Sequence, residues 1–198
     1  MSIVGIDEIV YGAEDLERCG RFLDDWGLVR READSQRLVY ETGNGGRVVV
    51  ADPAALTDSP AFEDGPTLRQ VVWGVSDPAD LDTLRRQLAS APSFFDDGSR
   101  VGCIDPNGMT VRFQVTARRA LEASGALSNT WDRRERINTP APIYERAMPI
   151  EVGHVVFFVA DLVATQAFYE SLGFVLSDRY PERGAFMRCA ARGGHHDL

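Results

Sequence analysis

The sequence is poor in the residues that mark exported, membrane-spanning and thiolate-metal proteins. Its three cysteines, Cys19, Cys103 and Cys189, are odd in number and far apart, which argues against a disulfide framework and against a clustered thiolate site. No apolar run approaches the roughly 18 residues that a membrane helix needs. The start of the chain shows no basic segment followed by a long apolar stretch, so no export signal is indicated. We therefore expect a cytoplasmic protein.

Basic residues are in the minority, and this excludes one class of partner. Lys and Arg number 21 against 30 Asp and Glu, and the formal net charge is -9. Such a charge repels phosphate backbones, and the one basic stretch that contains an aromatic residue, 131–136, reads better as a solvated linker face. We expect neither nucleic acid nor a membrane as a partner.

Histidine is also scarce, and its placement is uneven. The chain has three, His154, His195 and His196, and all of them lie in its last quarter. A site that uses histidine must therefore lie in the C-terminal part of the chain.

An internal repeat organises most of what remains. Residues 5–32 and 151–178 align without a gap, so that Asp15 meets Asp161 and Gly27 meets Gly173. A fainter copy begins at residue 68 and carries its aspartate at Asp77. The chain therefore uses one supersecondary unit three times.

Each copy predicts the same order of elements. A short β-rich run ends at an aspartate whose carboxylate can cap the next helix, and a glycine suited to the left-handed conformation ends the helix in two of the copies. Further β-rich runs follow each helix, and DPNG at 105–108 is typical of a turn between two strands. The unit is thus β-α-β-β-β. The three opening strands are expected at 8–13, 70–75 and 154–159.

This repeat resembles the vicinal oxygen chelate superfamily, which includes glyoxalases, bleomycin and fosfomycin resistance proteins and type I extradiol ring-cleaving dioxygenases. The resemblance covers about residues 3–116 and 150–198. DPNGMTVRF at 105–113 looks like the last strand of a paired unit, and 153–174 looks like the first strand and helix of a metal-bearing unit. It implies an α+β fold of repeated units that form open, cup-shaped mixed sheets, with two such domains in tandem and the second incomplete.

The resemblance also implies the domain bounds. Residues 1–117 would form an N-terminal, metal-free paired domain, 118–150 a linker, and 151–198 the first part of a C-terminal metal-bearing domain. The chain stops where a fourth unit would follow, so it is either part of a longer enzyme or a natural truncation. On its own, 151–198 is too short to bury a proper core.

The superfamily holds its metal on two histidines and a glutamate from three strands of a cup. In the first cup the matching positions are Glu8, Gln70 and Arg112. An arginine cannot ligate a cation, so we expect this cup to be metal-free. In the second cup His154 occupies the position of the first ligand, and we assign it to the metal by resemblance.

The C-terminal histidines are assigned by the same resemblance. In extradiol enzymes a catalytic histidine precedes Asp or Thr and then an apolar residue, and His196-Asp197-Leu198 fits that pattern. His196 is therefore the predicted acid/base residue. Because neighbours on a strand point to opposite faces, His195 is expected to face outward.

The resemblance implies Fe(II) as cofactor, with Mn(II) possible, and a small aromatic diol with O2 as substrates. Metal binding brings both reactants to one centre, and an imidazole suits proton transfer because it titrates near neutral pH. We also expect a homo-oligomer. Two alternatives stay open: a non-redox metal-dependent member such as a glyoxalase or thiol transferase, and a metal-free binding or scaffold protein.

Overall fold

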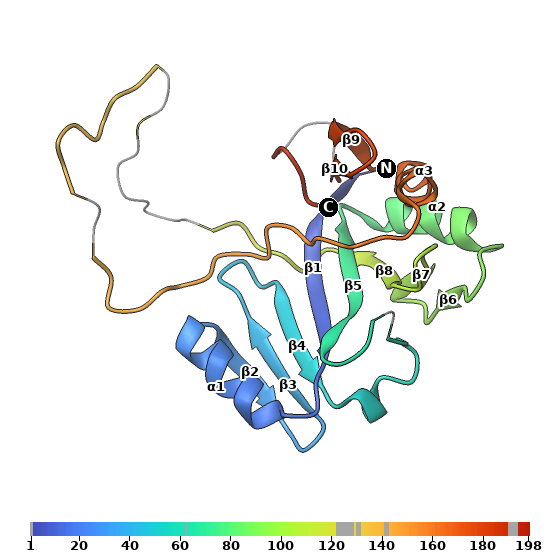
Figure 1. The fold of residues 1–198 in the computed structure, drawn as a ribbon, viewed down its shortest axis with the longest axis horizontal. Coiled ribbons are helices and arrows are strands. Elements are labelled where there is room, and N and C mark those ends of the chain that lie inside the picture. Colours follow the sequence, from blue (N-terminus) through green and yellow to red (C-terminus); the bar gives the residue numbers. More distant parts are fainter. Residues whose placement is uncertain (1, 62, 122–128, 130–131, 141–142, 190–193) are drawn as a thin grey trace.

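The computed structural model describes residues 2–61, 63–121, 129, 132–140, 143–189 and 194–198. Most of its strands belong to one mixed sheet with the order β2-β3-β4-β1-β5-β8-β7-β6 (Figure 1). Its strands are β1 (Ile3–Gly12), β2 (Val29–Ala33), β3 (Arg37–Glu41), β4 (Arg47–Ala51), β5 (Thr67–Val75), β6 (Phe95–Asp96), β7 (Arg100–Ile104) and β8 (Thr110–Val115). The predicted α+β class is confirmed.

The sheet is built from two copies of one arrangement that meet in the middle. β1 and β5 pair antiparallel at the centre, β1 pairs parallel with β4, and β5 pairs parallel with β8. The strand order therefore reads the same from either edge, with β2-β3-β4-β1 matched by β6-β7-β8-β5. Helices α1 (Leu16–Trp26) and α2 (Pro78–Leu88) pack on the two halves.

The ends of the helices follow the predicted local signals. Asp15, Asp77 and Asp161 each accept a hydrogen bond from a backbone N–H in the first turn of the next helix, at 2.9, 3.0 and 2.9 Å. Gly27 and Gly173 adopt φ of 101° and 97°, the left-handed region that favours glycine. These three caps and two stops are confirmed.

The third unit contributes α3 (Leu162–Ser171) and a separate hairpin of β9 (Val175–Tyr180) and β10 (Gly184–Arg188). The predicted strand at 154–159 is wrong: no strand is assigned at 151–160. A strand requires a ladder of hydrogen bonds with a neighbouring strand. Among the described residues, this stretch forms one backbone hydrogen bond, from Val155 N–H to the Asp197 carbonyl at 3.1 Å.

The third unit packs against the second, and their side chains share one hydrophobic core. The Phe174 ring meets Trp73 of β5 edge-on at 4.8 Å between centroids. The Tyr169 hydroxyl donates to Asp105 at 3.1 Å, and the Asn107 side-chain amide donates to the Thr165 hydroxyl at 3.0 Å. The β7–β8 turn and β5 therefore hold α3 in place beside the main sheet.

The segment between β8 and α3 crosses the molecule (Figure 1). Its described residues form no helix or strand beyond an isolated bridge. Near its end, the carbonyls of Pro149 and Ile150 accept backbone bonds from Gly43 and Asn44, both at 2.9 Å. Across the described residues, no helix is both long and apolar enough to cross a bilayer. The proposed division at 117 and 150 stays a prediction.

Candidate functional site

The three histidines lie close together in the third unit, beside β10. The rings of His154 and His196 lie 4.9 Å apart between centroids. His195 Nδ1 lies 2.9 Å from His196 Nδ1, and both rings contact Phe186 of β10, at 5.5 and 5.0 Å. The site therefore combines residues about forty positions apart in the sequence.

His195 is exposed, yet its ring contacts that of His196; its expected outward orientation stays a prediction. Residues 194 and 195 form a bend, so the alternation of side chains along a strand does not apply to this pair. The two imidazoles instead share a short N···N contact, in which one ring nitrogen donates and the other accepts. His195 also lies 4.0 Å from a carboxylate oxygen of Asp178, measured from its Nε2.

Backbone hydrogen bonds hold the His196 segment against β10. Met187 N–H donates to the Leu198 carbonyl at 2.7 Å, and Asp197 N–H donates to the Met187 carbonyl at 2.8 Å. The Asp197 carboxylate accepts from Cys189 N–H at 2.9 Å. Together with the bond from Val155, these contacts place His196 beside His154, and sequence spacing alone could not have shown this.

The described residues do not complete a metal centre. No group of three His, Cys, Asp or Glu side chains is placed to hold a metal ion in the part of the chain that the structure describes. His154 and His196 are close enough to act together, yet a facial triad also needs a carboxylate and a second ligating histidine. The residues present thus do not by themselves fit the Fe(II) site that the resemblance implies.

The buried thiols are unsuited to nucleophilic chemistry. Burial, and then the Asp105 carboxylate, raises the pKa of Cys103 to about 11. Burial, and then the Asp197 carboxylate, raises the pKa of Cys189 to about 12. Because the thiolate is the nucleophile, both side chains are inert at neutral pH.

In the first cup, the three positions that match metal ligands contact other side chains. Glu8 accepts two hydrogen bonds from Arg100, at 3.0 and 3.4 Å. The Gln70 carbonyl oxygen accepts from Arg112 Nε at 2.7 Å and from the Ser59 hydroxyl at 3.1 Å. This set offers an ion pair and a hydrogen-bond network that includes the Arg112 cation, and the absence of metal from this cup remains a prediction.

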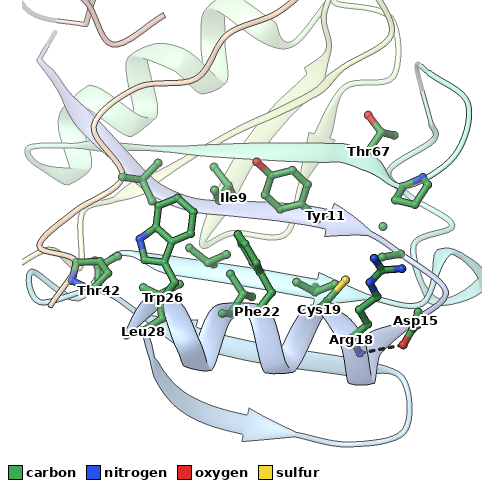
Figure 2. Close-up of a pocket in the computed structure, with 18 of the residues that line it drawn as sticks. Ile9, Tyr11, Asp15, Arg18, Cys19, Phe22, Trp26, Leu28, Thr42 and Thr67 are labelled. Atoms are coloured by element: carbon green, nitrogen blue, oxygen red, sulfur yellow. Dashed lines mark hydrogen bonds between the residues drawn. The ribbon is translucent and has the colours of Figure 1, made fainter. Parts of the chain in front are cut away.

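An apolar cavity lies elsewhere, between α1 and β1 of the first unit. It measures about 680 Å³ and is lined mainly by apolar side chains of α1 and β1 together with residues of the crossing segment. Figure 2 shows Phe22 and Trp26 extending from α1 toward Tyr11 on β1. The sequence signal for this cavity was the spacing of Phe22 and Trp26, one helical turn apart on α1. Leu16 and Leu23 of the same helix pack against the core. Phe22 and Trp26, which line this cavity, are 58% and 56% exposed.

Comparisons with known proteins agree with this fold. No protein-family model matches the sequence, and no curated protein matches it either. Among solved structures, the Mn(II)-bound glyoxalase of Novosphingobium aromaticivorans is similar, with a TM-score of 0.66, 18% identity and coverage of 99% of this chain and 60% of that one. The fold of this chain is thus that of vicinal oxygen chelate proteins.

Two 2,3-dioxygenases show the same likeness. Homoprotocatechuate 2,3-dioxygenase of Brevibacterium fuscum, in complex with 3,4-dihydroxyphenylacetate, has a TM-score of 0.65 and 17% identity, with 99% of this chain and 59% of that chain covered. The Pseudomonas 2,3-dioxygenase LapB has a TM-score of 0.65 and 18% identity, with 100% and 69% covered. This chain therefore spans about three fifths to two thirds of the length of these structures.

Proposed function

We propose that this chain is the first three units of a metal-dependent extradiol dioxygenase, which cleaves the ring of a catechol-type diol with O2. The observation that carries the proposal is the approach of His154 and His196, with 4.9 Å between ring centroids, on a chain with this fold. The complex of the Brevibacterium fuscum enzyme with 3,4-dihydroxyphenylacetate supports the substrate class.

In this proposal the two histidines have different tasks. His154 is a metal ligand, and His196 holds and then delivers a proton beside the substrate oxygens. Fe(II), or Mn(II) in its place, would supply a Lewis-acidic centre that gathers diol and O2. The contact between His195 and His196 would orient the His196 ring and select its tautomer. The remaining metal ligands, a second histidine and a carboxylate, would have to come from a further unit of a longer polypeptide.

A non-redox, metal-dependent reaction is the second candidate. It is supported by the glyoxalase match, whose TM-score of 0.66 is close to the 0.65 of the two dioxygenases compared above. A catechol would be consumed with O2 uptake in the first case, whereas a glyoxalase substrate would be isomerised without O2. Oxygen consumption therefore separates the two candidates.

Metal binding by the chain itself is the first test. We expect anaerobic titration calorimetry to detect only weak Fe(II) binding, because a single assigned ligand cannot hold a labile ferrous ion. The variant His154→Ala should abolish what binding there is, and His195→Ala serves as its control. Tight one-to-one binding that survives loss of His154 would refute the ligand assignment.

A polypeptide that contains this chain and a further unit provides the second test. His196→Phe should leave its metal content nearly unchanged and slow ring cleavage by roughly a hundred- to ten-thousandfold, the usual contribution of an acid/base group. His154→Ala should lose metal and activity together. Full activity of His196→Phe would show that another group moves the proton.

A further inference from the structure

Arg112 of β8 is a buried cation that forms no ion pair with a carboxylate in the part of the chain that the structure describes. Its side chain lies inside the first cup and only 7% of the residue is exposed. Its guanidinium lies 3.5 Å from the centre of the Phe95 ring, and its Nε donates to the neutral amide of Gln70 at 2.7 Å. Its Nη1 has no hydrogen-bond partner among the residues that the structure describes.

The acidic side chains around Arg112 do not balance its charge. Glu8 is bound by Arg100 at 3.0 Å. Asp97 accepts hydrogen bonds from the backbone N–H groups of Ser99 and Arg100, at 2.9 and 2.7 Å. Asp58 is exposed and forms no ion pair with Arg112 among the described residues. The guanidinium thus has no direct ion pair among the described residues, although the charges of Asp58, Asp97 and Glu8 stabilise it from a distance. A buried cation without a directly bound counter-ion favours the binding of an anion.

A cavity of about 400 Å³ opens beside this charge. Arg112 and Thr110 line it, together with the aromatic rings of Phe94 and Phe95 and the apolar side chains of Pro60 and Ile104. The Thr110 hydroxyl is buried and, like Arg112 Nη1, has no partner among the described residues. Two residues that each have an unpartnered polar atom therefore line one partly apolar space of the size that small ligands occupy.

We propose that the first cup binds a small carboxylate with a flat apolar body, of the size of benzoate. Its carboxylate would accept from Arg112, since guanidinium and carboxylate match in charge and planar geometry. The Thr110 hydroxyl would donate to a carboxylate oxygen, and the ring would lie against Phe94 and Phe95. Burial lowers the pKa of Arg112, even though nearby carboxylates, Asp58 first, act to raise it. This site is separate from the histidines and does not depend on the proposed function.

The binding test compares three anions by titration calorimetry on the complete chain. We expect benzoate to bind at least about tenfold more tightly than acetate or inorganic phosphate, because only benzoate fills both the polar and the apolar part of the cavity. Phosphate binding as tight as that of benzoate would overturn the ligand class. Absence of benzoate binding at millimolar concentration would overturn the site.

Variants locate the site and keep the test informative. Arg112→Met should abolish benzoate binding, whereas Arg86→Met, at an exposed position on α2, should leave it unchanged. If Arg112→Met does not fold, Thr110→Val should still weaken binding several-fold, since it removes a hydroxyl and keeps the shape. Unchanged affinity in Thr110→Val would contradict the proposed geometry.

Asp58 provides the competing explanation, because it lines the same cavity and could close onto Arg112 as an internal counter-ion. If the site serves an external carboxylate, Asp58→Asn should tighten benzoate binding by removing a like charge. If Asp58 is the partner of Arg112, the same variant should destabilise the chain without improving binding, and the proposal is then wrong.

Discussion

The outer faces of the first and second units carry the same repeat in different surroundings. Tyr11 of β1 and Trp73 of β5 occupy corresponding positions of the repeat. Trp73 is fully buried under Phe174 of the third unit, whereas Tyr11 is 39% exposed. At the first unit, Pro149 and Val152 of the crossing segment lie beside this face, and a cavity of about 680 Å³ remains there.

The helices repeat this contrast. Phe22 of α1 and Leu84 of α2 are also equivalent, and their exposed fractions are 58% and 0%. An apolar residue at a given repeat position therefore becomes core or surface according to what covers it. Large exposed apolar patches mark contact surfaces. The third unit covers this face of the second unit, whereas the same face of the first unit stays exposed.

Removal of the cover over the second unit should have the largest effect. Residues 1–117 should fold alone, because the central β1–β5 pairing lies entirely within them. The fragment should nevertheless expose Trp73, lose stability to urea and shift its tryptophan emission to the red. Limited proteolysis of the complete chain should cut first within 117–150. A disordered fragment, judged by circular dichroism, would contradict the paired-unit interpretation.

Truncation of the two equivalent aromatics should give unequal losses. Trp73→Ala should cost about 3–5 kcal/mol of unfolding free energy, because it leaves a cavity in a packed core. Tyr11→Ala should cost less than about 1 kcal/mol, because water already reaches that side chain. Urea denaturation of both variants checks this, and equal losses would mean that both faces are covered in solution.

Thiol labelling should distinguish the open and covered regions. Cys19 lines the open cavity on α1 and is half-buried, whereas Cys103 and Cys189 are buried. Ellman's reagent should therefore modify one thiol per native chain, at least about a hundredfold faster than the other two, since those react only after local opening. Cys19→Ser should remove the fast phase. A fast phase that persists in this variant would place the open face elsewhere.

The effect of alkaline pH should be the most gradual, because it is spread over several pH units. An unperturbed thiol titrates near 9.0, whereas the pKa of Cys103 is about 11 and that of Cys189 about 12. A raised folded-state pKa gives stability that is complete below pH 9 and is lost as the pH rises toward 11 and 12. The free energy of unfolding should fall by up to about 1.4 kcal/mol per pH unit for each thiol. Replacing both cysteines by alanine should flatten the slope measured by urea denaturation.

Local chemistry determined what could be predicted from the amino-acid sequence. Short-range contacts produce the aspartate caps, the helix ends at Gly27 and Gly173 and the turn at Asp105. These features could therefore be predicted from short stretches of the sequence. The repeat then joined these stretches into units and indicated the fold. His154 and His196 could be assigned by resemblance, although their approach could not be derived from spacing.

Tertiary structure decided everything that depends on a distant partner. The stretch 154–159 has strand-like composition but lacks the neighbour that a ladder requires, and His195 turns toward His196 because a bend precedes that segment. The pairing of Glu8 with Arg100 and the unpaired Nη1 of Arg112 likewise join residues far apart in the chain. Caps and turns are short-range interactions, whereas burial and pairing depend on which surfaces meet after the chain has folded. The same repeat therefore produced one covered face and one open face.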